Sequence, residues 1–212
     1  MSHLVPRHDR RKFLLVATAV AVATLVAGVF LADPLVAIAR PIIRVLVLLL
    51  GLADSVGDHP AGGWKLSSAW NIPGIGAETS FDMQLEDPTL RMMLRGYPVF
   101  LALMCAPPWS PRDLVRTMTG LGVLYLLLLA SIVFVVFNLH VMAKAEIVNQ
   151  LALRFPAFSN QAVGPPSWMR SVSGLLASMG YIVIPYLAPA VLWVALKPEG
   201  WRLLAGPVKT RT

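Results

Sequence analysis

Residues 124–137 read LYLLLLASIVFVVF and form the centre of the strongest apolar run in the chain, which extends from Leu114 to about Val141. At about 1.5 Å per residue, a helix of this length crosses the roughly 30 Å hydrocarbon core of a bilayer. The composition agrees, because 57% of the residues are apolar and only 14% are charged, whereas a soluble domain has roughly 25% charged residues. The sequence therefore predicts an integral membrane protein.

Further apolar runs lie on both sides of this segment. The run from Phe13 to Ala32 follows a basic stretch, residues 1–12, and is longer than the apolar part of a cleaved signal peptide. A shorter, proline-bounded run extends from about Leu94 to Pro108, and a last run extends from about Val172 to Leu196. We therefore expect a membrane all-α fold with about four transmembrane helices.

The charge distribution predicts the orientation of these helices. With about four spans, the whole net charge of +7 falls on the inner side, as the positive-inside rule requires. Both termini are then cytoplasmic, and Lys197, Arg116 and Asp113 are inner-side charges. The expected partition is a cytoplasmic N-terminus at 1–12, transmembrane helices at 13–32, 94–108, 114–141 and 172–196, extracytoplasmic segments at 33–93 and 142–171, a cytoplasmic loop at 109–113 and a cytoplasmic tail at 197–212.

The segment from Leu35 to Ala53 allows two interpretations. Its second half is very apolar, but Arg40, Pro41 and Arg44 interrupt the first half. An arginine deep in a bilayer costs about 2.5 kcal/mol or more, which favours a helix lying along the outer interface with both arginines at the headgroup level. A fifth span is the rival interpretation, but it would place the acidic residues between 54 and 90 in the cytoplasm.

Within residues 33–93, two stretches carry the alternating pattern of half-buried β-strands. In the stretch 64–72 the apolar residues share one face with Ser68, and in the stretch 77–85 apolar residues alternate with polar ones. The intervening Pro-Gly-Ile-Gly, residues 73–76, is typical of a hairpin turn. A lone hairpin is marginally stable in water, so we expect this extracytoplasmic β-hairpin to pack on the chain's own helices or on a partner.

The sequence contains no catalytic, cofactor-binding or metal-binding motif, and we expect no cofactor. Cys105 and His140 could suggest a thiol nucleophile with its base. They are expected at the inner end of the second span and the outer end of the third, separated by most of the roughly 30 Å core. Asn138, Lys144 and Glu146 cluster with His140 where the third span leaves the membrane, and such interfacial polar residues favour a structural role.

The last predicted helix contains YIVIPYLAP at residues 181–189. Two of its prolines lie four residues apart and each removes a backbone donor, so the helix should bend there. This pattern is typical of a kinked packing helix or of a contact site for another membrane protein. The candidate partner-contact residues are Gly180, Tyr181, Pro185, Tyr186, Pro189 and Trp193.

The order of these features resembles the exosortase-associated membrane proteins, in particular the type named for exosortase H. The resemblance covers about residues 90–200, and its most specific part extends from Gly180 to Trp193. It implies a bacterial inner-membrane accessory in a system that handles proteins with C-terminal sorting signals. Exosortases themselves resemble cysteine transpeptidases with Cys, Arg and His at the outer face. This chain departs from that pattern, since Cys105 is expected at the inner face, and the resemblance carries no site residues over.

We therefore expect a non-catalytic accessory subunit of a bacterial inner-membrane complex that assists an exosortase-type protein-sorting system. Its expected partners are other integral membrane proteins, including an exosortase, and the lipid bilayer, but no nucleic acid. A small-solute transporter subunit is one alternative, although the chain lacks the paired repeats and buried charge typical of transporters. A membrane-embedded cysteine peptidase or transpeptidase is the other, and the expected separation of Cys105 and His140 opposes it.

Overall fold

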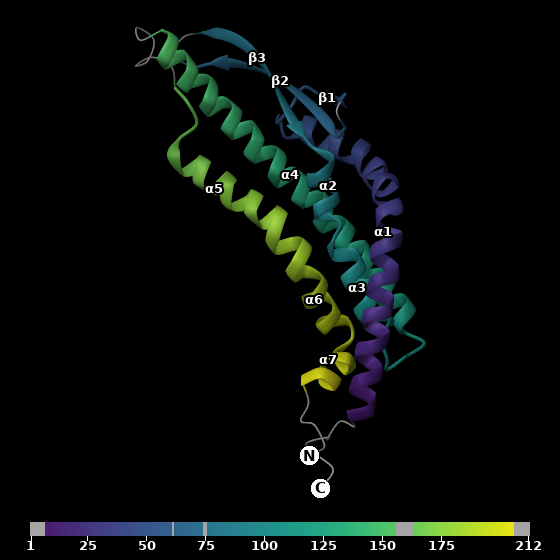
Figure 1. The fold of residues 1–212 in the computed structure, drawn as a ribbon. Coiled ribbons are helices and arrows are strands. Elements are labelled where there is room, and N and C mark those ends of the chain that lie inside the picture. The colour runs from purple at the N-terminus through teal and green to yellow at the C-terminus, as the bar shows by residue number, and fades with distance from the viewer. Residues whose placement is uncertain (1–6, 61, 74–75, 156–162, 206–212) are drawn as a thin grey trace. The chain divides into compact units, whose positions relative to one another are not determined.

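The computed structural model describes residues 7–60, 62–73, 76–155 and 163–205, which are mostly helical and include one small sheet (Figure 1). The elements are α1 (Arg7–Leu49), β1 (Ser55–Asp58), β2 (Trp64–Ile72), β3 (Ala77–Leu85), α2 (Asp87–Met93), α3 (Gly96–Cys105), α4 (Asp113–Arg154), α5 (Ser167–Ser178), the π-helix η2 (Met179–Val183), α6 (Ile184–Leu196) and α7 (Pro198–Ala205). They form two compact units. The first unit comprises Met1–Pro34, Leu94–Leu128 and Val183–Thr212, and the second unit comprises Leu35–Met93 and Leu129–Ile182.

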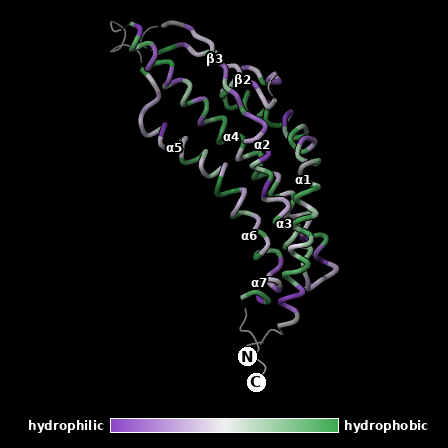
Figure 2. The backbone as a smooth tube through the Cα atoms, viewed as in Figure 1, coloured by the Kyte–Doolittle hydropathy of each residue, from purple (hydrophilic) through white to green (hydrophobic). Residues whose placement is uncertain are grey.

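In the described part of the chain, 3 helical stretches are long and apolar enough to cross a membrane. They are Asp9–Gly28 in α1, Asp113–Arg154 in α4, and Ser167–Leu196, which runs through α5, η2 and α6. Figure 2 shows the hydrophobic residues that dominate the central turns of α4. The chain is therefore a multi-pass membrane protein, but the candidate spans number 3, where the sequence predicted about four.

The difference arises in the expected second span, residues 94–108. This region holds α3, which has only 10 residues and is therefore about 15 Å long, half the thickness of a hydrocarbon core. Pro107 and Pro108 end the helix because they have no backbone N–H, and Pro107 holds the preceding Ala106 in an extended conformation with ψ 146°. By itself α3 is too short to span a bilayer.

The segments expected as a first span and a separate interfacial helix belong to the single helix α1. Pro34 and Pro41 lie inside it without ending it. In the second unit, Ala39, Ile43 and Val47 are each 0% exposed and recur every fourth residue, so one face of this C-terminal part of α1 is packed. Arg40 forms an ion pair with Asp58 of β1, which gives this charge a partner in its own unit.

The predicted hairpin is confirmed, and it is part of a sheet with the order β1-β2-β3. β2 and β3 pair antiparallel from Trp64 opposite Leu85 to Ile72 opposite Ala77. The turn residues 74 and 75 lie outside the described residues. Gly63 precedes β2 at φ +88°, and a Cβ there would lie 2.3 Å from the Leu85 carbonyl oxygen, so the chain requires glycine at this point. The short strand β1 carries no alternating pattern and was not predicted.

The sheet packs on the chain's own helix α4 within the second unit. The rings of Phe81 and His140 lie 5.7 Å apart, and the Lys144 ammonium lies 5.3 Å from the centre of the Trp70 ring. The buried face of the sheet includes Trp64, Leu66, Ser68, Ile72, Met83 and Leu85. The sequence allowed the hairpin to pack on the chain's own helices or on a partner protein. In the structure it packs on the chain's own helix α4.

Candidate functional site

The proline-bounded segment of the last candidate span departs from α-helical geometry. Pro185 has no N–H to offer the carbonyl of Tyr181, four residues earlier, and its ring crowds that carbonyl. The structure has a π-helix at this place, Met179–Val183. The bend predicted from the prolines is therefore a local widening of the helix, a feature frequent at functional sites.

In the second unit, Gly180 lies directly against the backbone of α4. A Cβ at this position would lie 2.9 Å from the carbonyl oxygen of Ser131, so glycine allows the two helices their close approach. The neighbouring Tyr181 is half-buried, with Thr89 and Glu86 near its phenol. Both of these candidate contact residues therefore pack within the chain.

In the first unit, Pro185 and Pro189 pack together against Gly96, the first residue of α3. Because Pro189 has no N–H, the carbonyl of Pro185 lacks its usual helical donor. A Cβ on Gly96 would lie 2.6 Å from that carbonyl oxygen and 2.7 Å from Cγ of Pro189. Both prolines are buried, so they shape the α3–α6 packing inside the unit.

Trp193, another candidate partner-contact residue, is also internal. Its side chain is 3% exposed and belongs to a cluster with Phe13, Phe100 and Met104. The Trp193 ring lies 6.0 Å from that of Phe13 in α1 and 6.3 Å from that of Trp201 in α7. Trp193 therefore packs against α1, α3 and α7 of the first unit.

Tyr186 differs from the other candidate residues because its side chain is 50% exposed. Its hydroxyl accepts a hydrogen bond of 3.3 Å from the guanidinium of Arg95, an exposed residue next to the start of α3. Both residues belong to the first unit. The sequence placed Arg95 at the outer end of the expected span 94–108 and did not connect it with Tyr186, because no local pattern relates residues so far apart in the chain.

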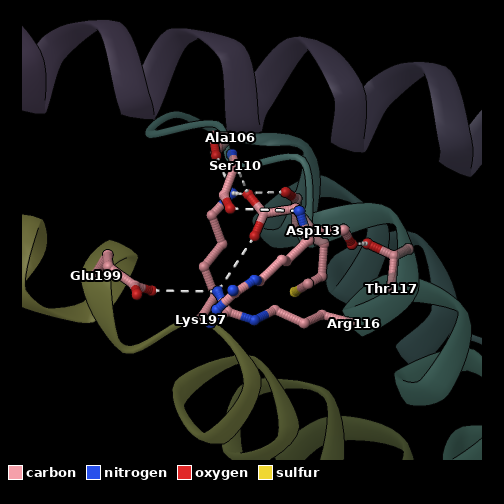
Figure 3. Close-up of polar contacts among 9 residues, drawn as sticks. Ala106, Ser110, Asp113, Arg116, Thr117, Lys197 and Glu199 are labelled. Atoms are coloured by element: carbon pink, nitrogen blue, oxygen red, sulfur yellow. Dashed lines mark hydrogen bonds and ion pairs between the residues drawn. The ribbon is translucent and has the colours of Figure 1, made fainter.

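A buried charged cluster lies where α3 ends, α4 begins and α6 ends (Figure 3). The side chain of Lys197 is 1% exposed, and its ammonium donates hydrogen bonds of 2.8 Å to the Met104 carbonyl and 2.5 Å to the Ala106 carbonyl. These carbonyls lie at the C-terminal end of α3, where a cation is favoured by the helix dipole and satisfies orphan acceptors. Lys197 therefore caps α3 from the junction between α6 and α7.

The counter-charge for Lys197 is Asp113, the first residue of α4. Its carboxylate, 5% exposed, lies 3.4 Å from the Lys197 ammonium and 3.3 Å from the Arg116 guanidinium. It also accepts a 2.9 Å hydrogen bond from the backbone N–H of Ser110, in the manner of a capping box. The guanidinium of Arg116 also lies 3.5 Å from the carboxylate of Glu199 in α7.

This cluster was present in the sequence only as charges that marked the inner side of the membrane. The Ser110-x-x-Asp113 spacing before an apolar run signals a helix start. A Lys that directly follows the last span does not reveal that its side chain folds back into the protein. Chemically, the cluster holds helix ends together and has its donors and acceptors engaged with one another.

The pair considered as a nucleophile and base is divided between the units. Cys105 is the last residue of α3 in the first unit and is partly exposed. His140 lies in α4 in the second unit, where it packs beside Phe81. Within the described ranges, no group of His, Cys, Asp and Glu residues is arranged to hold a metal ion.

The comparison with protein families gives a match over most of the chain. The family model described as exosortase H-associated membrane protein matches residues 7–200, which include both units' helices and the sheet. The chain has no significant match among curated proteins or among solved structures. Because the match extends from the start of α1 into α7, the chain belongs to the family of exosortase H-associated membrane proteins.

Proposed function

We propose that the chain is a non-catalytic accessory subunit of a bacterial inner-membrane complex whose other member is an exosortase-type protein. The observation that carries this proposal is the family match over residues 7–200, since the family's description associates it with exosortase H. The accessory role then follows from what the described side chains do.

Several polar side chains of both units support the fold. Lys197 and Asp113 are engaged with helix ends and with each other. In the second unit, Asn138 accepts a 3.1 Å hydrogen bond from Ser173 of α5, and His140 and Lys144 lie beneath the sheet. These side chains hold helices and strands of the chain together. Such a structural role suits a subunit that binds or positions a partner.

The proposal includes an orientation. The positive-inside rule places the charged cluster around Asp113 at the cytoplasmic face and the sheet on the other side of the membrane. A reporter that needs an extracytoplasmic location should be active when fused after Gly63 and inactive when fused after Ser110. The reverse pattern would overturn the orientation and leave the accessory role to be judged by the next experiment.

The accessory role is tested by co-expressing the chain with an exosortase-type protein of the same organism. We expect the two to co-purify in mild detergent. Deletion of the chain should reduce processing of a C-terminal sorting signal, and the Cys105→Ala variant should restore it fully. An exosortase that is recovered without the chain and processes its substrate equally well in the deletion strain would contradict the proposal. Loss of processing by a stable Cys105→Ala variant would instead make the cysteine-enzyme alternative primary.

A further inference from the structure

The Arg95–Tyr186 pair lies at an unusual depth for a guanidinium group. Tyr186 is inside the candidate span Ser167–Leu196. At about 1.5 Å per residue, roughly 16 Å of helix separate it from Lys197, just beyond the end of this span. With the inner edge of a hydrocarbon core about 30 Å thick placed at the end of this span, the hydroxyl of Tyr186 lies near the middle of the core. The guanidinium of Arg95 hydrogen-bonds this hydroxyl at 3.3 Å and therefore lies at the same depth.

A charged group at this depth needs more partners than the described part of the chain supplies. A guanidinium has five N–H donors, and in the described part of the chain the Tyr186 hydroxyl is the one hydrogen-bond partner of the Arg95 side chain. An arginine at the centre of a membrane helix is costly, and such residues face a partner or a water-filled cavity. Both side chains of this pair are exposed on the surface of the first unit.

The geometry also leaves the second member of the pair ready to bind an anion. The Tyr186 oxygen accepts from Arg95, so its own O–H remains able to donate. Near the pair in the chain, Val99 of α3 is 46% exposed and Leu187 of α6 is 58% exposed. The Arg95 guanidinium and the Tyr186 hydroxyl can therefore both donate to a single carboxylate, and a guanidinium binds a carboxylate through two parallel hydrogen bonds. The exposed apolar residues suit a carboxylate carried on an apolar helix.

Two other sources of an anion fit the position less well. Lipid headgroups lie at the edges of the hydrocarbon core, far from its middle. A second copy of this chain would have to supply an acidic residue at mid-depth. The candidate spans contain Asp9, Asp113 and Glu146 as their acidic residues, and each lies toward an end of its helix. A different membrane protein is therefore the occupant that the charges favour.

We propose that Arg95 and Tyr186 form an intramembrane binding site for an Asp or Glu side chain in a transmembrane helix of a partner protein. The identity of the partner as an exosortase-type protein rests on the proposed function above. The chemistry of the contact rests on the depth, exposure and hydrogen bonding of the pair.

The test uses the full chain purified in mild detergent from cells that contain its natural membrane partners. Arg95→Leu removes the charge and should reduce partner recovery by about 30-fold or more, as expected when one member of a desolvated charge pair is lost. Arg95→Lys should retain part of the binding, because lysine keeps the charge but not the fork. Arg112→Leu is the matched control, since Arg112 is an exposed arginine of the same unit outside the apolar run, and its partner recovery should equal that of the unmodified chain.

A photoreactive amino acid in place of Tyr186 identifies the partner. We expect a cross-link to a transmembrane segment of another protein that contains an Asp or Glu. Exchanging the charges, with Arg95→Glu in this chain and lysine at the partner's acidic position, should restore recovery, which separates a lost contact from a misfolded chain. Equal recovery for Arg95→Leu and Arg112→Leu, or cross-links only to lipid or to a second copy, would overturn the site.

The two proposals fail in different ways. If the exosortase co-purifies with the chain and Arg95→Leu leaves its recovery unchanged, the accessory function stands and the Arg95–Tyr186 site is rejected. If the cross-linked partner is another membrane protein with an acidic residue in its span, the site stands and the assignment to an exosortase is rejected.

Discussion

In the first unit, the Lys197–Asp113 pair is buried where helix ends meet, whereas in the second unit the Lys65–Asp82 pair lies on the exposed face of a sheet. Lys197 and Asp113 are 1% and 5% exposed, while Lys65 and Asp82 of the sheet are 43% and 50% exposed. Water can replace a lost partner in the second case but not in the first. The comparison shows that similar ion pairs in one chain should differ greatly in their effect on stability.

The largest effect is expected for Lys197→Met. This change leaves the buried Asp113 carboxylate without its ammonium and two carbonyls of the α3 end without their donor. Breaking a buried pair from one side costs about 3–5 kcal/mol. Thermal unfolding of the purified protein in detergent should show a strongly lowered midpoint.

The double variant Lys197→Met with Asp113→Asn is the control for this prediction. It removes both charges, so its loss of stability should be smaller than the sum of the two single losses. A Lys197→Met protein that unfolds like the unmodified chain would show that the cluster does not hold the first unit together.

A second, smaller effect is expected for Gly96→Ala in the α3–α6 packing of the same unit. The new Cβ would lie 2.6 Å from the Pro185 carbonyl oxygen, a backbone atom that cannot move without shifting α6. Overpacking of this kind costs about 1–3 kcal/mol. Gly122→Ala is the matched control: a Cβ at Gly122 meets nothing within 4 Å, so this change in α4 should stabilise the helix by up to about 1 kcal/mol. Equal melting midpoints for the two variants would contradict the packing argument.

The elements that follow a simple periodic pattern could be predicted from the sequence. The strands 64–72 and 77–85 match β2 and β3, since alternation needs only local information. The apolar run from Leu114 is inside α4. The prolines at 185 and 189 correctly indicated a disturbed helix, which the structure contains as the π-helix η2.

The rest depended on contacts between distant residues. A helix through Pro34 and Pro41 is set by the packed face of Ala39, Ile43 and Val47, which composition does not reveal. The sequence could not predict whether four candidate residues pack inside the chain or contact a partner: Gly180, Pro185, Pro189 and Trp193. Glycine, proline and tryptophan suit either kind of contact. Since Gly180 lies against Ser131, a Gly180→Leu variant would report on the chain's own packing rather than on partner binding.

In the second unit, Lys144→Met should have a modest effect. The Lys144 ammonium lies 5.3 Å from the centre of the Trp70 ring, and Lys144 is only half-buried. A cation–π contact of this kind contributes about 0.5–1 kcal/mol, and methionine preserves the packing of the aliphatic stem. The melting midpoint should fall slightly, well below the change for Lys197→Met. If Lys144→Met lowered the melting midpoint as much as Lys197→Met, the expected difference in stability effect between the two units would be wrong.

The smallest effect is expected on the exposed face of the sheet, where it appears as a pH dependence. The hydrogen bond from Lys65 at 2.8 Å, followed by that from Ser67 at 2.7 Å, holds the pKa of Asp82 below its ordinary value of 3.8. A lowered carboxyl pKa means that the ionised form contributes stability above 3.8, and that this contribution is lost as the pH falls through the folded-state pKa.

The Lys65→Met variant should therefore raise the pKa of Asp82 toward 3.8 without reaching it, because the Ser67 hydrogen bond remains. A carboxyl titration followed by NMR in detergent micelles measures this shift. The small stability difference between Lys65→Met and the unmodified chain should be present at neutral pH and should shrink as the pH falls below 3.8, where Asp82 becomes protonated in both proteins. Asp82→Asn removes the titrating group, so Lys65→Met added to that variant should have no pH-dependent effect from this pair. If the pKa of Asp82 is unchanged in Lys65→Met, the Ser67 hydrogen bond alone causes the lowered pKa. The Lys65–Asp82 ion pair then does not help to hold β2 and β3 together.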